Sequence, residues 1–234
     1  MIKSVIILAG GLGTRLRDAV PDLPKCMAPV AGRPFIDYVI DHLQQQGIHQ
    51  FIFALGYKSE AFEQHLSTAY PSLHYILSVE PEPLGTGGAI RLACKQAIEK
   101  TMLVVNGDTL FKIQLDKLAG FHDMCGAHCT LSLKPMRNMS RYGIVELNKD
   151  YSIHDFKEKQ FYEEGFINGG VYTLHAEKFL QENLPEKFSF EKDYLEQFYN
   201  QRRMYGVVQD EYFIDIGIPE DYERAQREFE NLKI

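Results

Sequence analysis

Residues 5–16, with the sequence VIILAGGLGTRL, join an apolar run to a loop that contains three glycines. The run Val5–Ala9 predicts a strand, because it is short and continuously apolar. The glycines at positions 10, 11 and 13 expose backbone N–H groups, so a phosphate can approach the chain closely. Their spacing matches neither GxxxxGK(S/T) nor GxGxxG, and a glycine turn alone is explained as well by structure as by binding. Arg15 and Lys25 would supply positive charge for an anion.

Apolar runs and amphipathic segments alternate through the first half of the chain. The predicted strands are 51–55, 73–79 and 102–105, and the predicted helices are 35–46 and 86–100. Continuous apolar strands separated by helices predict a parallel sheet that is covered on both faces. In such an α/β fold the ligand binds at the carboxyl ends of the strands.

The pattern changes after about residue 127, where strands follow one another with few helices between them. We expect strands at 129–134, 143–147, 153–156 and 166–174, helices at 176–183 and 190–200, a strand ending at Asp215 and a final helix from Pro219. The chain has no linker-like or low-complexity segment and no hexapeptide repeat of a β-helix. The simplest interpretation is one domain, 1–234, with halves of about 1–126 and 127–234. Its sheet would be Rossmann-like, mixed but mostly parallel, and flanked by helices.

The composition excludes several classes of protein. Lys and Arg number 25 and Asp and Glu 32, and the resulting net charge of −7 argues against a nucleic-acid partner. An anionic substrate must therefore be held by a local cluster of cations, backbone amides or metal. No stretch approaches the ~18 consecutive apolar residues of a membrane span, and no signal-peptide pattern precedes the first strand. With four scattered cysteines, the chain is expected to be cytoplasmic, without a membrane partner or a disulfide scaffold.

Two aspartates follow apolar strands. Asp108 ends the run Leu103–Asp108, and Asp215 ends the run Tyr212–Asp215. An aspartate at a strand end is often only a turn former, which explains either residue alone equally well. At the carboxyl edge of one sheet, however, the two carboxylates together could hold a hard cation such as Mg²⁺ through oxygen ligands.

Two further segments have both structural and functional explanations. The loop Glu80–Ala89, with the sequence EPEPLGTGGA, would either cap a helix through Thr86 or contact a ligand. The charged run Phe156–Lys159 is typical of a solvated face, but it precedes the pair Asn168-Gly169 on the next predicted strand.

Together these motifs resemble the signature of the sugar-nucleotide pyrophosphorylases, nucleotidyltransferases that act on sugar 1-phosphates. The string GGxGTRL followed by PK, here residues 10–16 and Pro24-Lys25, carries most of the resemblance, which extends from residue 5 to about 225. Arg17–Val20 replace the usual Pro-Leu-Thr segment. This variant is similar to the branch that includes D-glycero-α-D-manno-heptose 1-phosphate guanylyltransferases, as are YGIV at 142–145, INGG at 167–170 and EKFSFE at 186–191.

The resemblance implies a nucleotide-binding first half and a sugar-phosphate-binding second half. It assigns to the nucleotide Leu8, Ala9, Gly10, Gly11, Gly13, Thr14, Arg15, Lys25, Glu80, Gly85, Thr86, Asn106 and Asp108. It assigns to the sugar phosphate Gly143, Glu158, Lys159, Asn168 and Gly169. Arg15, Lys25, Asp108, Lys159 and Asp215 would be catalytic, and Asp108 and Asp215 would bind Mg²⁺.

The resemblance also implies a reaction. An oxygen of the sugar 1-phosphate would attack the α-phosphorus of a nucleoside triphosphate, and pyrophosphate would leave. The branch favours GTP, with Glu80 accepting from two adjacent N–H groups of guanine, and a manno-heptose 1-phosphate as acceptor. The partners would be these small molecules, and a homo-oligomer is left open. The alternatives are the 1-phosphate of mannose, glucose or an amino sugar, and a non-catalytic regulatory subunit that binds sugar nucleotides.

Overall fold

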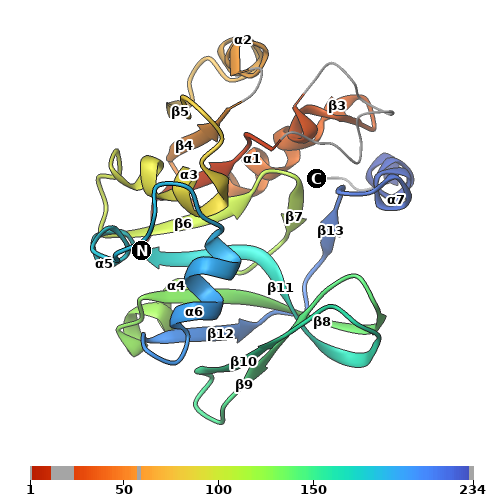
Figure 1. Ribbon diagram of the computed structural model, residues 1–234. Coiled ribbons are helices and arrows are strands. Elements are labelled where there is room, and N and C mark those ends of the chain that lie inside the picture. Colours follow the sequence, from red (N-terminus) through yellow and green to blue (C-terminus); the bar gives the residue numbers. More distant parts are fainter. Residues whose placement is uncertain (1, 12–23, 57–58, 232–234) are drawn as a thin grey trace.

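The computed structural model of the chain describes residues 2–11, 24–56 and 59–231. A nine-stranded sheet runs through the molecule in the order β10-β9-β11-β6-β1-β4-β5, with β8 joined to β11 and β12 joined to β8 (Figure 1). Its parallel part consists of β1 (Ser4–Leu8), β4 (Gln50–Leu55), β5 (His74–Val79) and β6 (Thr101–Asn106). These strands confirm the parallel first half that the alternating sequence pattern predicts.

The second half extends the same sheet with mixed pairing. β11 (Tyr162–His175) is antiparallel to β6, β8 and β9, and therefore joins the two halves of the chain. The other strands are β8 (Cys129–Met139), β9 (Ile144–Leu147), β10 (Ile153–Lys157) and β12 (Met204–Val208). The predicted Rossmann-like mixed sheet is confirmed.

Helices cover both faces of this sheet (Figure 1). They are α1 (Phe35–Gln45), α2 (Ser59–Ala69), α3 (Gly85–Cys94), α4 (Leu115–Cys125), α5 (Ala176–Leu180), α6 (Glu196–Phe198) and α7 (Pro219–Asn231). A π-helical turn, η2 (Phe190–Leu195), precedes α6, and a 3₁₀ turn, η1 (Lys25–Met27), precedes the hairpin of β2 (Pro29–Val30) and β3 (Arg33–Pro34). Across the described ranges, no helix combines the length and apolar character needed to cross a bilayer.

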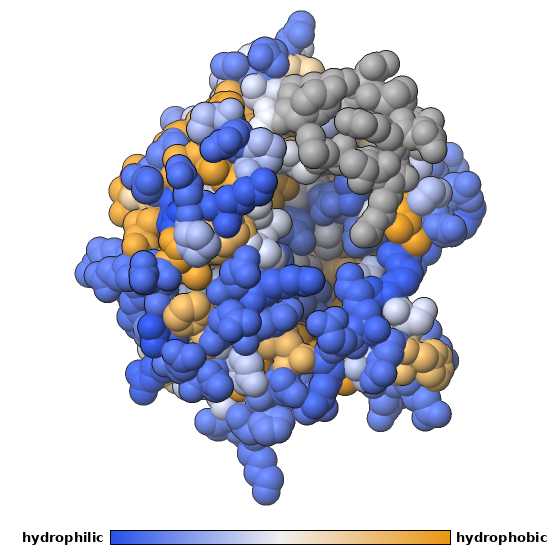
Figure 2. Space-filling view, viewed as in Figure 1, coloured by the Kyte–Doolittle hydropathy of each residue, from blue (hydrophilic) through white to orange (hydrophobic). Residues whose placement is uncertain are grey.

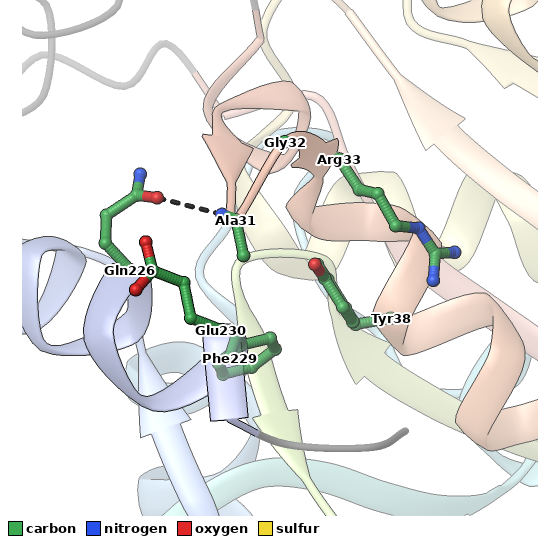
Figure 3. A pocket seen from close by; sticks show the side chains of 7 residues that line it. All are labelled: Ala31, Gly32, Arg33, Tyr38, Gln226, Phe229 and Glu230. Carbon is green, nitrogen blue, oxygen red and sulfur yellow. Dashed lines mark hydrogen bonds between the residues drawn. The ribbon is translucent and has the colours of Figure 1, made fainter.

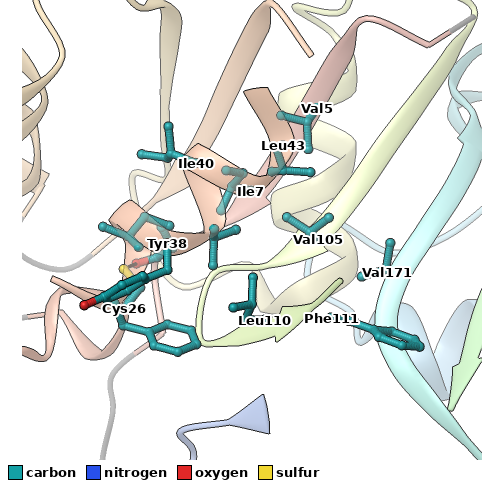
Figure 4. Packing of buried hydrophobic residues seen from close by; sticks show 14 of the residues in the cluster. Val5, Ile7, Cys26, Tyr38, Ile40, Leu43, Val105, Leu110, Phe111 and Val171 are labelled. Atoms are coloured by element: carbon teal, nitrogen blue, oxygen red, sulfur yellow. Dashed lines mark hydrogen bonds between the residues drawn. The ribbon is translucent and has the colours of Figure 1, made fainter. Parts of the chain in front are cut away.

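The sheet has an apolar core on each face. Along β1, Val5 and Ile7 belong to one core and Ile6 belongs to the other, as the alternation of side chains along a strand requires. The first core contains the buried face of α1, including Ile40, and is drawn in part in Figure 4. The second core contains Phe190 of η2. Burial on both faces explains why the strands are continuously apolar.

A separate two-stranded ladder positions the second aspartate. β7 (Thr109–Phe111) and β13 (Phe213–Asp215) are antiparallel and pair Asp215 with Thr109, beside the turn that carries Asp108. The N–H of Ile216 donates to the carbonyl oxygen of Asp108 at 3.0 Å. The expectation that both aspartates lie at the edge of one sheet is therefore wrong, because Asp108 follows β6 of the large sheet whereas Asp215 ends β13 of the small one.

Some element boundaries also differ from the predictions. α3 ends at Cys94 rather than at residue 100, because the chain continues through turns with i→i+3 hydrogen bonds and Ile98 is 78% exposed. The predicted helix 190–200 divides into η2 and α6. The sequence pattern does not predict α4, β7 or β12. β7 and β12 have three and five residues, too few for a clear alternation.

Gly88 in α3 and Gly120 in α4 provide a matched pair of substitutions. A Cβ atom at Gly88 would lie 2.7 Å from the carbonyl oxygen of Glu186, whereas a Cβ at Gly120 would meet nothing within 4 Å. Gly88→Ala is expected to lower the free energy of unfolding by about 1–3 kcal/mol through overpacking. Gly120→Ala is expected to raise it by about 0.4–1 kcal/mol, because the unfolded chain loses freedom. Denaturant unfolding measures both, and a stabilising Gly88→Ala would contradict the close contact between residue 186 and α3.

Candidate active site

Three charged groups meet where β6 and β13 end and η1 begins. The Nζ of Lys25 donates to Oδ2 of Asp108 and lies 3.9 Å from Oδ1 of Asp215. The side chains of Lys25, Asp108 and Asp215 are 17%, 30% and 25% exposed, so solvent screens their charges only in part. One ammonium group therefore faces two carboxylates, so these three groups together carry one net negative charge when both acids are ionised.

Burial and the neighbouring carboxylate control the ionisation of Asp215. Burial raises the pKa of Asp215, the negative charge of Asp108 raises it further, and the positive charge of Lys25 opposes both effects. The backbone N–H of Gly217 donates to Oδ1 of Asp215 at 2.7 Å. The raised pKa means that these surroundings favour the neutral acid over the carboxylate. Additional positive charge would therefore be stabilised here.

A cavity of about 200 Å³ opens beside the three charged groups. Its lining, which defines the strand-end cavity, consists of Leu8, Ala9, Gly11, Lys25, Cys26, Thr86, Asn106, Asp108 and Glu191. Leu8 and Asn106 are paired at the carboxyl ends of the parallel strands β1 and β6. The cavity therefore lies where an α/β sheet binds its ligand.

A larger cavity of about 430 Å³ lies in the second half. Its lining, which defines the β9–β11 cavity, consists of Gly143, Ile144, Val145, Phe156, Lys157, Glu158, Lys159, Asn168, Ser189, Glu191, Lys192 and Glu196. Burial raises the pKa of Glu196, and the charge of Glu158 raises it further. Lys157 is engaged by Asp155 at 2.7 Å, whereas no carboxylate of the described ranges lies within ion-pair distance of Lys159. Lys159 is thus a cation available for an anionic ligand.

Glu191 is common to the two linings, so the strand-end cavity and the β9–β11 cavity adjoin one another. Figure 2 shows that the face of the molecule seen in Figure 1 is hollowed near its centre and is largely hydrophilic around that hollow. The arrangement offers room for two polar ligands whose reacting groups could meet near Lys25 and Asp108.

Another cavity, of about 540 Å³, lies between the β2–β3 hairpin and α7 (Figure 3). Its lining consists of Ala31, Gly32, Arg33, Tyr38, Gln226, Phe229 and Glu230. Arg33 is neutralised by Asp41 at 2.8 Å, and Gln226 accepts the N–H of Ala31 at 2.8 Å. This cavity contains none of the predicted site residues, and it is separate from the candidate active site.

Residues 4–231 match the nucleotidyl transferase family. The chain belongs to this family. It is 47% identical over 226 residues to the D-glycero-α-D-manno-heptose 1-phosphate guanylyltransferase of Aneurinibacillus thermoaerophilus. The aligned region covers 97% of this chain and 98% of that protein. It is 41% identical to the protein of the same name from Campylobacter jejuni, over 93% of this chain and 96% of that protein. The crystal structure of HddC from Yersinia pseudotuberculosis complexed with GMP-PN has a TM-score of 0.87 at 35% identity and covers 97% of this chain and 100% of that one.

The structure brings most of the predicted site residues of this nucleotidyltransferase to the two cavities. Seven residues predicted to bind nucleotide line the strand-end cavity: Leu8, Ala9, Gly11, Lys25, Thr86, Asn106 and Asp108. Four residues predicted to bind the sugar phosphate line the β9–β11 cavity: Gly143, Glu158, Lys159 and Asn168. The pairing of Asp215 with Thr109 brings Asp215 to Lys25 and Asp108.

Three predicted glycines lie outside both linings, and each has a steric explanation. A Cβ at Gly10 would lie 2.8 Å from the backbone that follows β4. Gly85 has a φ of +75°, and a Cβ there would lie 2.5 Å from the carbonyl oxygen of Phe188. A Cβ at Gly169 would lie 2.5 Å from the ring of Phe111. These glycines allow close approach of chain segments, and their contacts with substrates stay predictions.

Glu80 also lies outside the lining of the strand-end cavity, half-buried directly after β5 in the loop that leads to α3. Its Oε2 accepts the N–H of Leu84 at 2.7 Å, and its own N–H donates to the carbonyl oxygen of Leu55 at 2.8 Å. Burial raises the pKa of Glu80, and the hydrogen bond from Leu84 opposes this effect. The carboxylate is therefore held in place by the backbone rather than pointing freely into solvent.

Gly13, Thr14 and Arg15 lie outside the residues that the structure describes, and their roles stay predictions. The sequence motifs indicate no separate role for Glu191, which is the last residue of the string EKFSFE. In the local sequence, Glu191 is distinguished only by following the buried residues Phe188 and Phe190. That position does not indicate that a residue binds a ligand. Proximity to Thr86, which is far away in sequence, identifies it.

Asp108 and Asp215 fit a magnesium ion. Their oxygens are hard ligands, and Mg²⁺ in proteins is usually held by one or two carboxylates together with phosphate oxygens of the substrate. The net negative charge of Lys25, Asp108 and Asp215 and the raised pKa of Asp215 both favour an added cation. These two residues would hold the ion beside the strand-end cavity, whose lining includes Asp108.

Asp215→Asn is expected to reduce activity strongly without reducing stability. Loss of a charge that stabilises the transition state should lower kcat on the order of 10²–10³-fold. Because folding raises the pKa of Asp215, its ionised form costs stability above that pKa, and the cost disappears once the acid is protonated. The variant should therefore melt at the same or a higher temperature than the wild type at pH 7, and the difference should shrink as the pH falls.

Asp210→Asn is the matched control, because Asp210 is 77% exposed and lines neither cavity of the candidate active site. It should change kcat and melting temperature little. Near-normal kcat of Asp215→Asn at saturating Mg²⁺ would show that Asp215 does not hold the ion.

Proposed function

We propose that this nucleotidyltransferase transfers a guanylyl group from GTP to D-glycero-α-D-manno-heptose 1-phosphate and releases pyrophosphate. The observation that carries the proposal is the pair of adjoining cavities, one beside Lys25 and Asp108 and the other lined by Lys159. The names of the two relatives that are 47% and 41% identical over nearly their whole length support this acceptor and this donor. The GMP-PN in the HddC crystal structure supports a guanine nucleotide.

In this proposal an oxygen of the sugar 1-phosphate attacks the α-phosphorus of GTP in line while the bond to pyrophosphate breaks. The attacking oxygen is already an anion, so no general base is required. The chain contributes orientation and charge. Lys25 stabilises the negative charge that passes to the leaving pyrophosphate, and Lys159 holds the attacking phosphate. Mg²⁺ bound at Asp108 and Asp215 would supply further charge compensation for the phosphate oxygens.

The polar wall of the β9–β11 cavity would orient the sugar ring. Oδ1 of Asn168 accepts the N–H of Gly170 at 3.0 Å, and its Nδ2 donates to the hydroxyl of Tyr172 at 2.9 Å. These two bonds fix the amide and leave one N–H and one lone pair for a ligand. Glu158, an acceptor in the same lining, would take sugar hydroxyls. A site that pairs hydroxyl groups discriminates against sugars that lack them.

Glu80 is the proposed reader of the base. Guanine presents N1–H and an exocyclic N2–H₂ side by side, and an ionised carboxylate can accept from both. Uracil and thymine offer one N–H between two carbonyl oxygens, which a carboxylate repels. The hydrogen bond from Leu84 holds Glu80 at the end of α3 that carries Thr86 into the strand-end cavity.

The two halves would act as a single domain. β6 from the nucleotide half and β11 from the sugar-phosphate half are neighbouring strands, with Val171 paired to Val105. Because this pairing is continuous, the two cavities are held in a fixed relation by the sheet itself.

A substrate screen tests the proposed function directly. Pyrophosphate release is measured with GTP, ATP, UTP, CTP or dTTP against the 1-phosphates of the heptose, mannose, glucose and N-acetylglucosamine. The highest kcat/KM is expected for GTP with the heptose 1-phosphate. Higher kcat/KM with glucose 1-phosphate or with UTP would contradict the substrate assignment. Failure of every pair would favour the regulatory-subunit alternative.

Glu80→Gln tests the base assignment. Glutamine can still accept the N–H of Leu84, but it presents an amide N–H₂ group that opposes the donors of guanine. The kcat/KM for GTP should fall by the ~1–3 kcal/mol of an unmade buried hydrogen bond, or about 5- to 150-fold, while that for UTP should change less or rise. Glu82→Gln is the control, because Glu82 is exposed in the same loop. An unchanged GTP:UTP preference in Glu80→Gln would place base selection elsewhere.

A further inference from the structure

Glu191 lies in the first turn of η2, at the boundary between the strand-end cavity and the β9–β11 cavity. Within the part of the chain that the structure describes, it is the one residue that lines both. Single π-helical turns are frequent at functional sites. A carboxylate between two sites for phosphorylated ligands also opposes their binding through charge repulsion, so its position calls for a functional reason.

The carboxylate of Glu191 is fixed from the side of the strand-end cavity. Its Oε2 accepts the hydroxyl of Thr86 at 2.8 Å and the hydroxyl of Ser189 at 3.0 Å. The hydroxyl oxygen of Thr86 in turn accepts the N–H of Phe190 at 2.8 Å. Because that N–H occupies a lone pair of Thr86, the proton of the hydroxyl is left to point at Glu191. A residue of the strand-end cavity thus orients the carboxylate.

From the other side, Glu191 connects to Asn168 through Tyr172. Nδ2 of Asn168 donates to the hydroxyl of Tyr172 at 2.9 Å, and that buried hydroxyl lies near enough to Glu191 to be affected by its negative charge. Burial raises the pKa of Tyr172 well above its ordinary value, and the charge of Glu191 raises it further. Tyr172 therefore keeps its proton. Because the amide of Asn168 occupies a lone pair of the hydroxyl oxygen, that proton is left for the negatively charged Glu191.

The first turn of α3 is shaped to bring these groups together. The N–H of Gly87 donates to the carbonyl oxygen of Phe188 at 3.0 Å. A Cβ at Gly85 would lie 2.5 Å from the same oxygen, and side chains at these positions would separate the two segments. The glycines therefore let residues 186–190 lie directly on the start of α3 and bring η2 to Thr86.

We propose that Glu191 is a positioning residue that couples the two substrates. The proposal rests on the proposed function: nucleotide bound in the strand-end cavity fixes Thr86, Thr86 fixes the carboxylate of Glu191, and Glu191 fixes Tyr172 and the amide of Asn168 for the hydroxyls of the acceptor sugar. Bound donor therefore raises the affinity for the acceptor. By thermodynamic linkage, bound acceptor raises the affinity for the donor by the same factor.

The test is the dissociation constant of the sugar 1-phosphate with and without a saturating nucleotide analogue whose α–β bond cannot be cleaved, in the presence of Mg²⁺. Isothermal titration calorimetry on the wild type should give a ratio of about 5–150-fold, the usual range for coupled sites. Glu191→Gln should bring this ratio close to 1, because an amide has one acceptor oxygen instead of two and its N–H₂ group opposes a donor. Tyr172→Phe should do the same, because it removes only the hydroxyl from the core.

Asp193→Asn is the matched control. Oδ2 of Asp193 accepts the N–H of Ser189 at 2.7 Å in the same turn, but Asp193 lines neither cavity. It should keep the wild-type ratio. Equal loss of the ratio in Asp193→Asn and Glu191→Gln would mean that a loosened turn explains the effect, and the proposal would be overturned.

A ratio of 1 in the wild type, or a wild-type ratio in both Glu191→Gln and Tyr172→Phe, would overturn it as well. The titration uses the donor class and the acceptor with the highest turnover in the substrate screen. A wrong assignment of heptose or GTP therefore changes the ligands of the experiment and leaves the coupling measurement intact.

Discussion

The meeting of Lys25, Asp108 and Asp215 is the constraint on which the rest of the site depends. Two partly buried carboxylates repel each other, and one ammonium group compensates only one of them. Backbone pairing imposes the contact. The β7–β13 ladder and the hydrogen bond from Ile216 hold Asp215 beside Asp108 despite the repulsion between the two carboxylates. The divalent cation proposed for this site, and the triphosphate that it would accompany, would compensate the net negative charge of the three groups.

The mixed sheet explains how two substrates can reach this one point. The parallel strands β1 and β6 end at the strand-end cavity, and the antiparallel strand β11 runs beside β6 and carries Asn168 to the other cavity. The two cavities are therefore lined in part by residues of strands that belong to one sheet. Glu191 lines both cavities, and it comes from the helical turn η2 rather than from a strand of the sheet.

Much of this could be predicted from sequence where the signal is local. Continuous apolar runs identify the parallel strands, and the positions of Lys25, Asp108 and Lys159 follow from short motifs. Signals that depend on distant segments could not be read in the same way. The pairing of Asp215 with Thr109 joins strands of three residues each, and it corrects the expectation of one sheet edge. The resemblance assigns Gly85 to the nucleotide, but its positive φ and its close approach to Phe188 appear only in the folded chain. Glu191 has no local pattern that separates it from a solvated glutamate.

We propose that Asp108 and Asp215 act together as the ligands of the divalent ion that accompanies the nucleotide. The most direct test is Mn²⁺ binding in place of Mg²⁺, followed by the electron paramagnetic resonance signal of free Mn²⁺ in the presence of a GTP analogue that cannot be cleaved. The wild type should bind one Mn²⁺ per ternary complex, and Asp108→Asn and Asp215→Asn should each weaken this binding at least about tenfold, equivalent to ~1.4 kcal/mol. Wild-type Mn²⁺ affinity in both variants would contradict the claim.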